Sequence, residues 1–149
     1  MSKATQTDAM GSIQRGIKRT LDFVMSALGL ILLSPIFIII SVLMKFQGNG
    51  PIFFRQIRIG YKGKPFTIYK FRTMSSIVEE EGPQLVANSD RTNSTRLELF
   101  LRDHHLDELP QLWNVLCGDM SFVGPRPERQ YFIDKIQKHT DRYNLIYQM

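Results

Sequence analysis

Residues 23–44 have the sequence FVMSALGLILLSPIFIIISVLM, a run of 22 residues without a charge, of which fourteen are Phe, Val, Leu or Ile. On insertion scales such a run favours the bilayer. At about 1.5 Å per residue it is long enough to cross a hydrocarbon core of about 30 Å. A cleaved signal peptide is rejected, because the run is longer than a typical signal core and no small-residue cleavage site follows Met44. The run therefore predicts a membrane-inserted helix.

Pro35 lies near the middle of this helix, where it removes a backbone hydrogen bond and predicts a bend. Ser34 before it can satisfy the carbonyl that the proline leaves without a donor. Basic residues lie on both flanks: Arg15, Lys18 and Arg19 before the run, and Lys45, Arg55 and Arg58 after it. This symmetry gives little charge difference to orient a full span. A re-entrant hairpin and a spanning helix with a tolerated proline both stay open on these residues.

The composition indicates one domain with an anionic partner. The chain has 149 residues, and 19 Lys and Arg against 14 Asp and Glu give a formal charge of +5. Such a balance favours phospholipid, a phosphorylated substrate or nucleic acid. The single cysteine, Cys117, excludes an intramolecular disulfide and a Cys-rich metal site.

The chain divides into three parts by composition. Residues 1–12 have no apolar period and predict a disordered leader. Residues 13–46 hold a basic juxtamembrane helix, Ile13 to Asp22, expected among lipid headgroups, and then the membrane helix. Residues 47–149 form the folded domain, in which Glu79 to Arg91 predicts a loop.

A basic segment follows the membrane helix, with no acidic residue between Lys45 and Val78. Within it, Pro51 to Ile59 and Phe66 to Arg72 are rich in Phe, Ile, Tyr and Thr, and the glycine-containing stretch between them predicts a β-hairpin. Strand alternation places Lys70 and Arg72 on one face. Attraction to lipid headgroups and binding of substrate phosphate both explain these cations.

A helix is expected from Thr95 to His104, because apolar residues recur there at helical spacing and Thr95 with Glu98 matches a capping box. His104 and His105 are adjacent, so on a helix their side chains point apart and joint chelation of a metal is disfavoured. We interpret both histidines as structural.

Asp107 and Glu108 stand just ahead of a short apolar helix, Gln111 to Cys117, which Gly118 is expected to terminate. Asp107 is predicted at the N-cap, where the helix dipole keeps a carboxylate ionised and attracts anions. Two carboxylates can also hold Mg²⁺ together with substrate phosphate oxygens. Taken alone, an acidic pair at a helix start is more often a solvated cap.

Residues 118–127 read GDMSFVGPRP, and the prolines on either side of Arg126 restrict the backbone around one guanidinium. A pre-ordered arginine suits bidentate phosphate contact at a low entropic cost. A rigid loop with an incidental surface arginine is the alternative. A phosphate loop of the G-x-x-x-x-G-K-[ST] type does not occur in the chain, so an ATPase lacks its central motif.

Several short blocks occur in one order along the chain. They are Arg19 with Asp22, Ser34-Pro35, Gly50 to Gln56, Tyr69 to Met74, Leu106 to Asn114 and Gly118 to Pro127. In this order the blocks resemble the bacterial sugar transferase family, the monotopic polyprenyl-phosphate phosphoglycosyl transferases. The similarity runs from about Arg15 to the end of the chain, and several blocks in register are far more specific than any single one.

The resemblance implies an α-rich α/β, monotopic membrane protein with a small β-hairpin and several amphipathic helices. Its N-terminal helix, broken at Ser34 and Pro35, would enter and leave the cytoplasmic leaflet of the bacterial inner membrane. Residues 47–149 would be a cytoplasmic sugar transferase catalytic domain. Relatives continue beyond a segment like Tyr143 to Met149, so the domain is expected to be C-terminally truncated.

The resemblance also implies a reaction. Asp107 would attack the sugar-linked phosphate of a UDP-sugar, release UMP and pass the phosphosugar to polyprenyl phosphate, the first membrane step of a surface polysaccharide or glycoconjugate. Mg²⁺ would be held by Asp107 and Glu108, and Glu108 would assist as ligand or base. The candidates for phosphate contact are Arg126 first, and then Lys70, Arg72 and Arg102.

Two positions depart from the pattern of many relatives, which carry a hydroxyl residue in place of His105 and a basic residue in place of Cys117. Activity is expected to tolerate both. A non-catalytic basic membrane-anchored protein, or an inactive fragment of such an enzyme, is the second hypothesis and gives Asp107 no role. Nucleic-acid binding by the cations between Arg55 and Arg72 ranks lowest, so no nucleic-acid partner is expected, and a homo-oligomer stays open.

Overall fold

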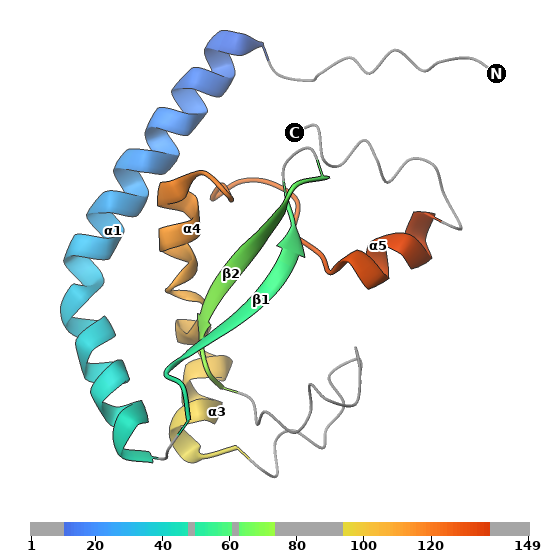
Figure 1. Cartoon of the computed structure of the whole chain (residues 1–149). Helices are drawn as coiled ribbons and strands as arrows, with labels where there is room; N and C mark the ends of the chain where they lie inside the picture. Colours follow the sequence, from blue (N-terminus) through green and yellow to red (C-terminus); the bar gives the residue numbers. More distant parts are fainter. Residues whose placement is uncertain (1–10, 48–49, 61–62, 74–93, 138–149) are drawn as a thin grey trace.

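The computed structural model describes residues 11–47, 50–60, 63–73 and 94–137. The predicted leader up to residue 10, the predicted loop at 79–91 and the segment 143–149 lie outside the described residues. Figure 1 shows one long helix along one side of the molecule, with a short helix and a hairpin beside it. The elements in chain order are α1 (Ser12–Gln47), β1 (Phe53–Ile59), β2 (Pro65–Phe71), α3 (Arg96–Asp103), the 3-10 turn η3 (Leu106–Glu108), α4 (Gln111–Cys117) and α5 (Gln130–Gln137).

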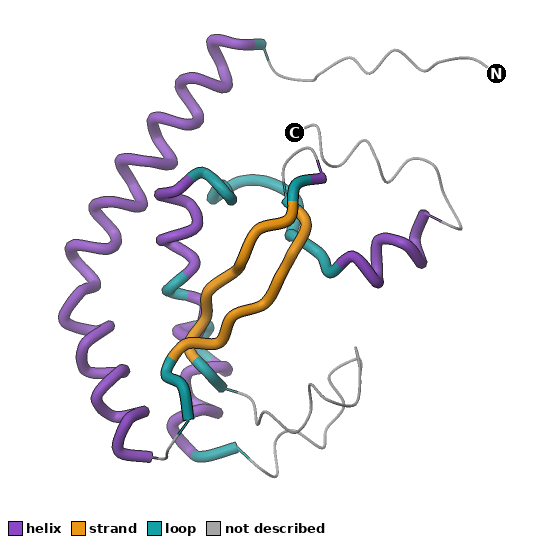
Figure 2. The backbone as a smooth tube through the Cα atoms, in the orientation of Figure 1, coloured by secondary structure: helices purple, strands orange, loops and turns teal. Residues whose placement is uncertain are grey.

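The membrane helix and the basic segment before it form a single helix of 36 residues that contains Pro35. The helix curves along its length but is not interrupted (Figures 1 and 2). The Ser34 hydroxyl donates to the Ile31 carbonyl at 2.7 Å. That carbonyl lies four residues before Pro35, so it is the one that the proline leaves without a backbone donor. The expected compensation by Ser34 is confirmed, but the expected break at Ser34 and Pro35 is not present, because α1 continues through both residues as one curved helix (Figure 1).

Most apolar side chains of α1 face away from the rest of the chain. Only 11% of its most apolar 18-residue window is buried. Such a surface is unfavourable in water and typical of a segment in contact with lipid. By length and composition α1 could cross a membrane. The large apolar residues exposed along it include Phe23, Leu28, Ile31, Leu32, Ile38, Ile39 and Leu43.

The opposite face of the C-terminal half of α1 closes the hydrophobic core. Ile40 and Met44 are buried together with Phe71 of β2 and Leu101 of α3. Phe37 extends this cluster, with its ring centre 5.6 Å from that of Phe71. The apolar helix is therefore bound to the folded domain by its own side chains.

The predicted β-hairpin is confirmed. β1 and β2 pair antiparallel, in a register that runs from Phe53 opposite Phe71 to Ile59 opposite Pro65. These strands begin or end within two residues of the predicted bounds. The hairpin lies beside α4 in Figure 1 and carries Lys70 toward η3, which contacts β2.

The two short helices behave largely as predicted. Thr95 caps α3, and both hydrogen bonds of the capping box with Glu98 are present. Gly118 ends α4 in the left-handed region at φ 92°. The helix was expected to end at His104; α3 ends at Asp103 with His104 as its C-cap, and His105 lies in the turn after it at φ 55°. The two histidines thus belong to a helix end and a turn, not to one helix.

Candidate active site

The acidic pair lies in η3, one turn ahead of α4. Pro110, with no side-chain hydrogen bond, is the N-cap of α4. The prediction that Asp107 caps this helix is therefore wrong. Proline suits a helix start, because its missing N–H would have no helical partner there. Because α4 begins only after Pro110, the two carboxylates lie before the N-terminus of the helix. The effect of the helix dipole on them is therefore small, since it falls off within one turn.

Glu108 is the charge centre of the site. Its Oε1 lies 2.6 Å from Lys70 Nζ and 3.3 Å from Arg126 Nη2. Burial alone would raise the pKa of Glu108, but the hydrogen bond and charge of Lys70 and the charge of Arg126 hold it below the ordinary value. Glu108 is therefore ionised and gathers two cations at one oxygen.

Asp107 has a different environment although it is the next residue. Its side chain is buried, and Thr73 Oγ1 donates to Asp107 Oδ2 at 3.5 Å. Burial raises the pKa of Asp107, the negative charge of Glu108 adds to this, and Lys70 only partly offsets it. The dipole was expected to favour the ionised form, so this direction is opposite to the expectation. The negative charge of a buried carboxylate is unfavourable. A covalent bond from its oxygen to an electrophile removes that charge, which suits a nucleophile.

The other two predicted cations have different partners. Arg102 donates to the Thr73 carbonyl and so touches the site through the residue that binds Asp107. Arg72 follows the last residue of β2, and its guanidinium lies against Gly50. Lys70 and Arg126 therefore contact the acidic pair directly. Arg102 contacts it only through Thr73, and Arg72 lies against Gly50 instead.

Two residues of the site were not predicted. Thr73 is buried and joins Arg102 to Asp107. Asn114 is completely buried; it accepts a hydrogen bond from the Tyr69 backbone at 3.1 Å and donates to the Thr67 carbonyl at 2.7 Å, which fixes α4 to β2. Both lie in the blocks that carry the family resemblance, which is the one signal in the sequence that points to them.

Arg126 reaches Glu108 from a loop that is anchored on its C-terminal side. The Ile59 backbone donates to the Glu128 carbonyl at 2.9 Å. Arg58 donates to the Pro127 carbonyl at 3.4 Å and lies 3.6 Å from the Glu128 carboxylate. The side chain of Arg126 remains 73% exposed, so it can also contact a ligand.

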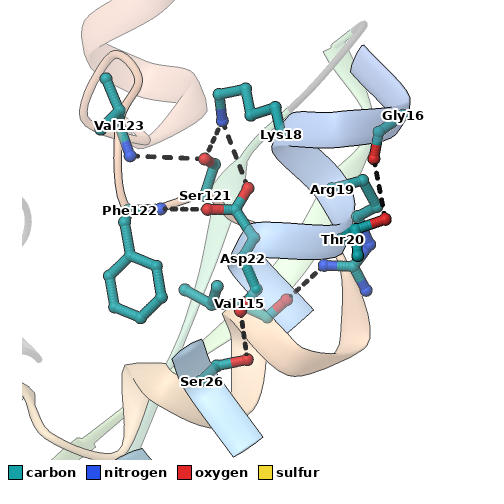
Figure 3. Close-up of polar contacts among 10 residues, drawn as sticks. All are labelled: Gly16, Lys18, Arg19, Thr20, Asp22, Ser26, Val115, Ser121, Phe122 and Val123. Atoms are coloured by element: carbon teal, nitrogen blue, oxygen red, sulfur yellow. Dashed lines mark hydrogen bonds and ion pairs between the residues drawn. The ribbon is translucent and has the colours of Figure 1, made fainter. Parts of the chain in front are cut away.

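The N-terminal cations of α1 bind protein groups. Arg19 donates to the Val115 carbonyl at 2.6 Å (Figure 3) and to the Leu116 carbonyl, also at 2.6 Å, and so caps the end of α4. Lys18 pairs with Asp22 at 3.3 Å and donates to the Ser121 hydroxyl. These contacts were not anticipated, because both cations were expected among lipid headgroups.

The donor set fits a magnesium ion that completes its shell with substrate. Within the described ranges no group of three or more His, Cys, Asp and Glu side chains could enclose a metal. Asp107 and Glu108 are consecutive residues of η3, and the charge of Lys70 acts on both of their carboxyls. Mg²⁺ usually takes one or two carboxylates and fills its other positions with water and phosphate oxygens.

Comparison with known proteins gives consistent similarities. The model of the bacterial sugar transferase family matches residues 13–149. The UDP-glucose:undecaprenyl-phosphate glucose-1-phosphate transferase of Klebsiella pneumoniae is 39% identical over 93% of this chain and 28% of its own length. The enzyme of the same name from Caulobacter vibrioides is 43% identical over 85% of this chain and 48% of its own length.

A third relative differs in the sugar that its name gives. The UDP-N-acetylgalactosamine-undecaprenyl-phosphate N-acetylgalactosaminephosphotransferase of Aeromonas hydrophila is 39% identical over 85% of this chain and 30% of its own length. The chain thus spans less than half the length of each of these three relatives. Because the family model covers nearly the whole chain, the chain belongs to the bacterial sugar transferase family.

Proposed function

We propose that this chain transfers a sugar 1-phosphate from a UDP-sugar to polyprenyl phosphate. The observation that carries the proposal is a buried Asp107 beside a Glu108 that binds two cations, one from β2 and one from the loop before α5. The names of the relatives give undecaprenyl phosphate as the acceptor in each case, with glucose or N-acetylgalactosamine as the sugar. The proposed donor class is therefore a UDP-sugar.

The chemistry assigned to Asp107 is nucleophilic. One carboxylate oxygen attacks the phosphorus that bears the sugar, the bond from that phosphorus to the bridging oxygen breaks, and UMP leaves with this oxygen. A phosphosugar remains on Asp107 as a mixed anhydride. A phosphate oxygen of polyprenyl phosphate then attacks the same phosphorus, and the Asp107 carboxylate is released.

Lys70 and Arg126 are the proposed phosphate contacts. Both lie on Glu108 Oε1, so a diphosphate that approaches the pair meets two positive charges next to the nucleophile. A planar guanidinium can bind two phosphate oxygens at once, and lysine contributes a compact charge. Arg102 acts more remotely, through Thr73.

Mg²⁺ is the proposed cofactor, held by Asp107 and Glu108 and completed by phosphate oxygens of the donor. When bound, it would neutralise charge on the diphosphate. The residues of the chain keep their roles in this arrangement: Asp107 attacks, Thr73 orients its carboxylate, and Lys70 and Arg126 hold the donor.

The proposed membrane placement is monotopic, with α1 as a re-entrant helix in the cytoplasmic leaflet of the bacterial inner membrane. The folded domain holds α1 near both ends: Arg19 binds the end of α4, and Gln47 accepts a hydrogen bond from Thr95 at 2.9 Å. If α1 crossed the bilayer, the charged groups packed along it would lie in hydrocarbon, at a high cost in free energy. Re-entrance keeps the domain in water and brings the site to the headgroups of the acceptor lipid.

The covalent intermediate provides the direct test. Detergent-purified protein is incubated with Mg²⁺ and either UDP-glucose or UDP-N-acetylgalactosamine, without lipid acceptor, and its intact mass is measured. We expect one phosphosugar adduct on Asp107 and at most one equivalent of UMP. Asp107→Asn should form no adduct and lower acceptor-dependent turnover by a factor of at least about 10³.

Asp134→Asn is the matched control, because this carboxylate is exposed on α5 and bonds to Gln130 at 2.6 Å. It should form the adduct as the unaltered protein does. UMP release and product formation that persist in Asp107→Asn would exclude the nucleophilic role of Asp107, whereas no UMP release by the unaltered protein would favour the non-catalytic hypothesis.

A further inference from the structure

Asp22 of α1 bonds directly to the loop that leads to Arg126. Asp22 is 7% exposed, and its Oδ1 accepts a hydrogen bond from the Phe122 backbone at 3.3 Å. Its Oδ2 accepts from Lys18 at 3.3 Å, and Lys18 also donates to the Ser121 hydroxyl. Figure 3 shows these four residues together; we call them the clasp.

The clasp holds the loop on the side opposite to the Ile59–Glu128 bridge. The Val123 backbone donates to the Ser121 hydroxyl at 3.3 Å, which tightens the turn directly after the clasp. Arg126 lies between the two attachments, and its guanidinium reaches Glu108 at 3.3 Å. Neither attachment involves the side chain of Arg126, so the clasp acts on the backbone that carries it.

The contacts of Asp22 exceed what anchoring of α1 requires. Arg19 already ties the same part of α1 to α4 through the carbonyls of Val115 and Leu116. One carboxylate oxygen of Asp22 accepts a hydrogen bond from the backbone N–H of Phe122. The other binds Lys18, which also donates to Ser121, the residue before Phe122. A part-buried N–H that loses its acceptor is unfavourable, so removal of Asp22 favours another path for the loop.

We propose that Asp22 is a positioning residue: it holds residues 118–127 so that Arg126 faces Glu108 and the donor diphosphate. The membrane helix is thereby coupled to donor binding. This inference rests on the proposed function, since it takes Arg126 as a phosphate contact. It differs from a structural role in predicting that the effect of Asp22 on donor binding disappears when Arg126 is absent.

A double-mutant cycle tests the coupling in the full chain in detergent, with kcat and donor KM measured for Asp22→Ala, Arg126→Ala and the double variant. Arg126→Ala should raise donor KM about tenfold, as expected for the loss of a charged hydrogen bond. Asp22→Ala should raise KM by a similar or smaller factor. The double variant should have the KM of Arg126→Ala alone, because the two residues act in series.

Conservative and matched variants separate positioning from folding. Asp22→Asn keeps an oxygen that can accept from the Phe122 backbone, so its donor KM should lie close to that of the unaltered protein. Arg19→Ala removes an anchor of α1 whose hydrogen bonds go to Val115 and Leu116 of α4 and not to the clasp, so it should lower the thermal midpoint while donor KM stays within about twofold. If Asp22→Ala does not fold, Ser121→Ala, which removes the clasp hydroxyl that binds Lys18 and the Val123 backbone N–H, carries the same cycle with Arg126→Ala.

The outcomes distinguish the two proposals. Multiplying effects of Asp22 and Arg126 on KM would overturn the positioning role while the phosphate role of Arg126 stands. An unchanged KM in Arg126→Ala would overturn the phosphate contact in the proposed function, and the positioning role with it. Equal effects of Arg19→Ala and Asp22→Ala on donor KM would show that the clasp only anchors α1, and would overturn the positioning role of Asp22.

Discussion

Asp107 and Glu108 are neighbours in the chain, yet their pKa values move in opposite directions. Burial acts on both carboxyls. Lys70 and Arg126 lie against Glu108 and overcome burial there, whereas Asp107 receives only part of that compensation and feels the charge of Glu108 as well. The pair is thus divided into a stably charged partner and a carboxylate whose charge is unfavourable, a division often found at catalytic sites.

Neutralising each carboxyl should therefore shift stability in opposite directions at pH 7. A carboxyl whose pKa is raised by folding destabilises the protein once it is ionised, so Asp107→Asn should raise the thermal midpoint or leave it unchanged. A carboxyl whose pKa is lowered stabilises the protein above its ordinary pKa, so Glu108→Gln should lower the midpoint. Thermal unfolding in detergent with EDTA measures both.

The pH dependence supplies the control for this pair. The stabilisation by Glu108 is present above its ordinary pKa of 4.5 and is lost as pH falls through the lower, folded value. The difference between Glu108→Gln and the unaltered protein should accordingly shrink under acidic conditions. Midpoints that shift in the same direction for Glu108→Gln and Asp107→Asn at pH 7 would contradict the division of the pair.

At the scale of elements, the end of α4 depends on Gly118. Its φ of 92° is strained for residues with a side chain, and a Cβ there would lie 3.0 Å from the Arg19 guanidinium. Gly118→Ala should cost about 1 kcal/mol or more in the free energy of unfolding, because it combines backbone strain with displacement of a capping arginine. Chemical or thermal unfolding measures this loss.

Gly16 provides the matched substitution on the partner helix. It lies within α1, and a Cβ there would meet nothing within 4 Å. Gly16→Ala should stabilise the chain by up to about 1 kcal/mol, because alanine is the better helix former. Equal losses in Gly16→Ala and Gly118→Ala would show that the close approach of Arg19 to Gly118 does not matter.

The elements that the sequence predicted well depend on local patterns. The long helix follows from an uncharged run, the hairpin from alternating residues around a glycine-containing turn, and the α3 start from Thr95 and Glu98. The Asp107 cap failed because Pro110 begins the helix later than the acidic pair suggests. The clasp could not be foreseen from pattern, since Lys18 and Ser121 are 103 positions apart and meet only in the folded chain.

At the scale of the whole molecule, one helix has two surfaces with different surroundings. One face of α1 packs on the core through Ile40 and Met44, and much of the rest exposes apolar side chains. Its curve is convex on the side away from α4 and the hairpin (Figure 1). Insertion of the convex side into one leaflet would bury the apolar surface and leave both ends with the charged domain.

This geometry predicts that both ends of α1 are reached from the same side of the membrane. Ile13 and Phe46 are suitable reporters, because their side chains are 80% and 86% exposed. Each is replaced by cysteine in a Cys117→Ser background, and a membrane-impermeant maleimide is applied to intact and to lysed spheroplasts. If α1 is re-entrant from the cytoplasmic side, both cysteines should react only after lysis.

The exposed Cys117 of the unaltered chain reports the folded domain and serves as the reference for that face. A spanning α1 would carry one end to the outer surface, so that either Ile13→Cys or Phe46→Cys would react in intact spheroplasts. That result would contradict re-entrance. It would also require the domain to release α1 at one end, because Arg19 and Gln47 cannot both keep their partners across a bilayer of about 30 Å.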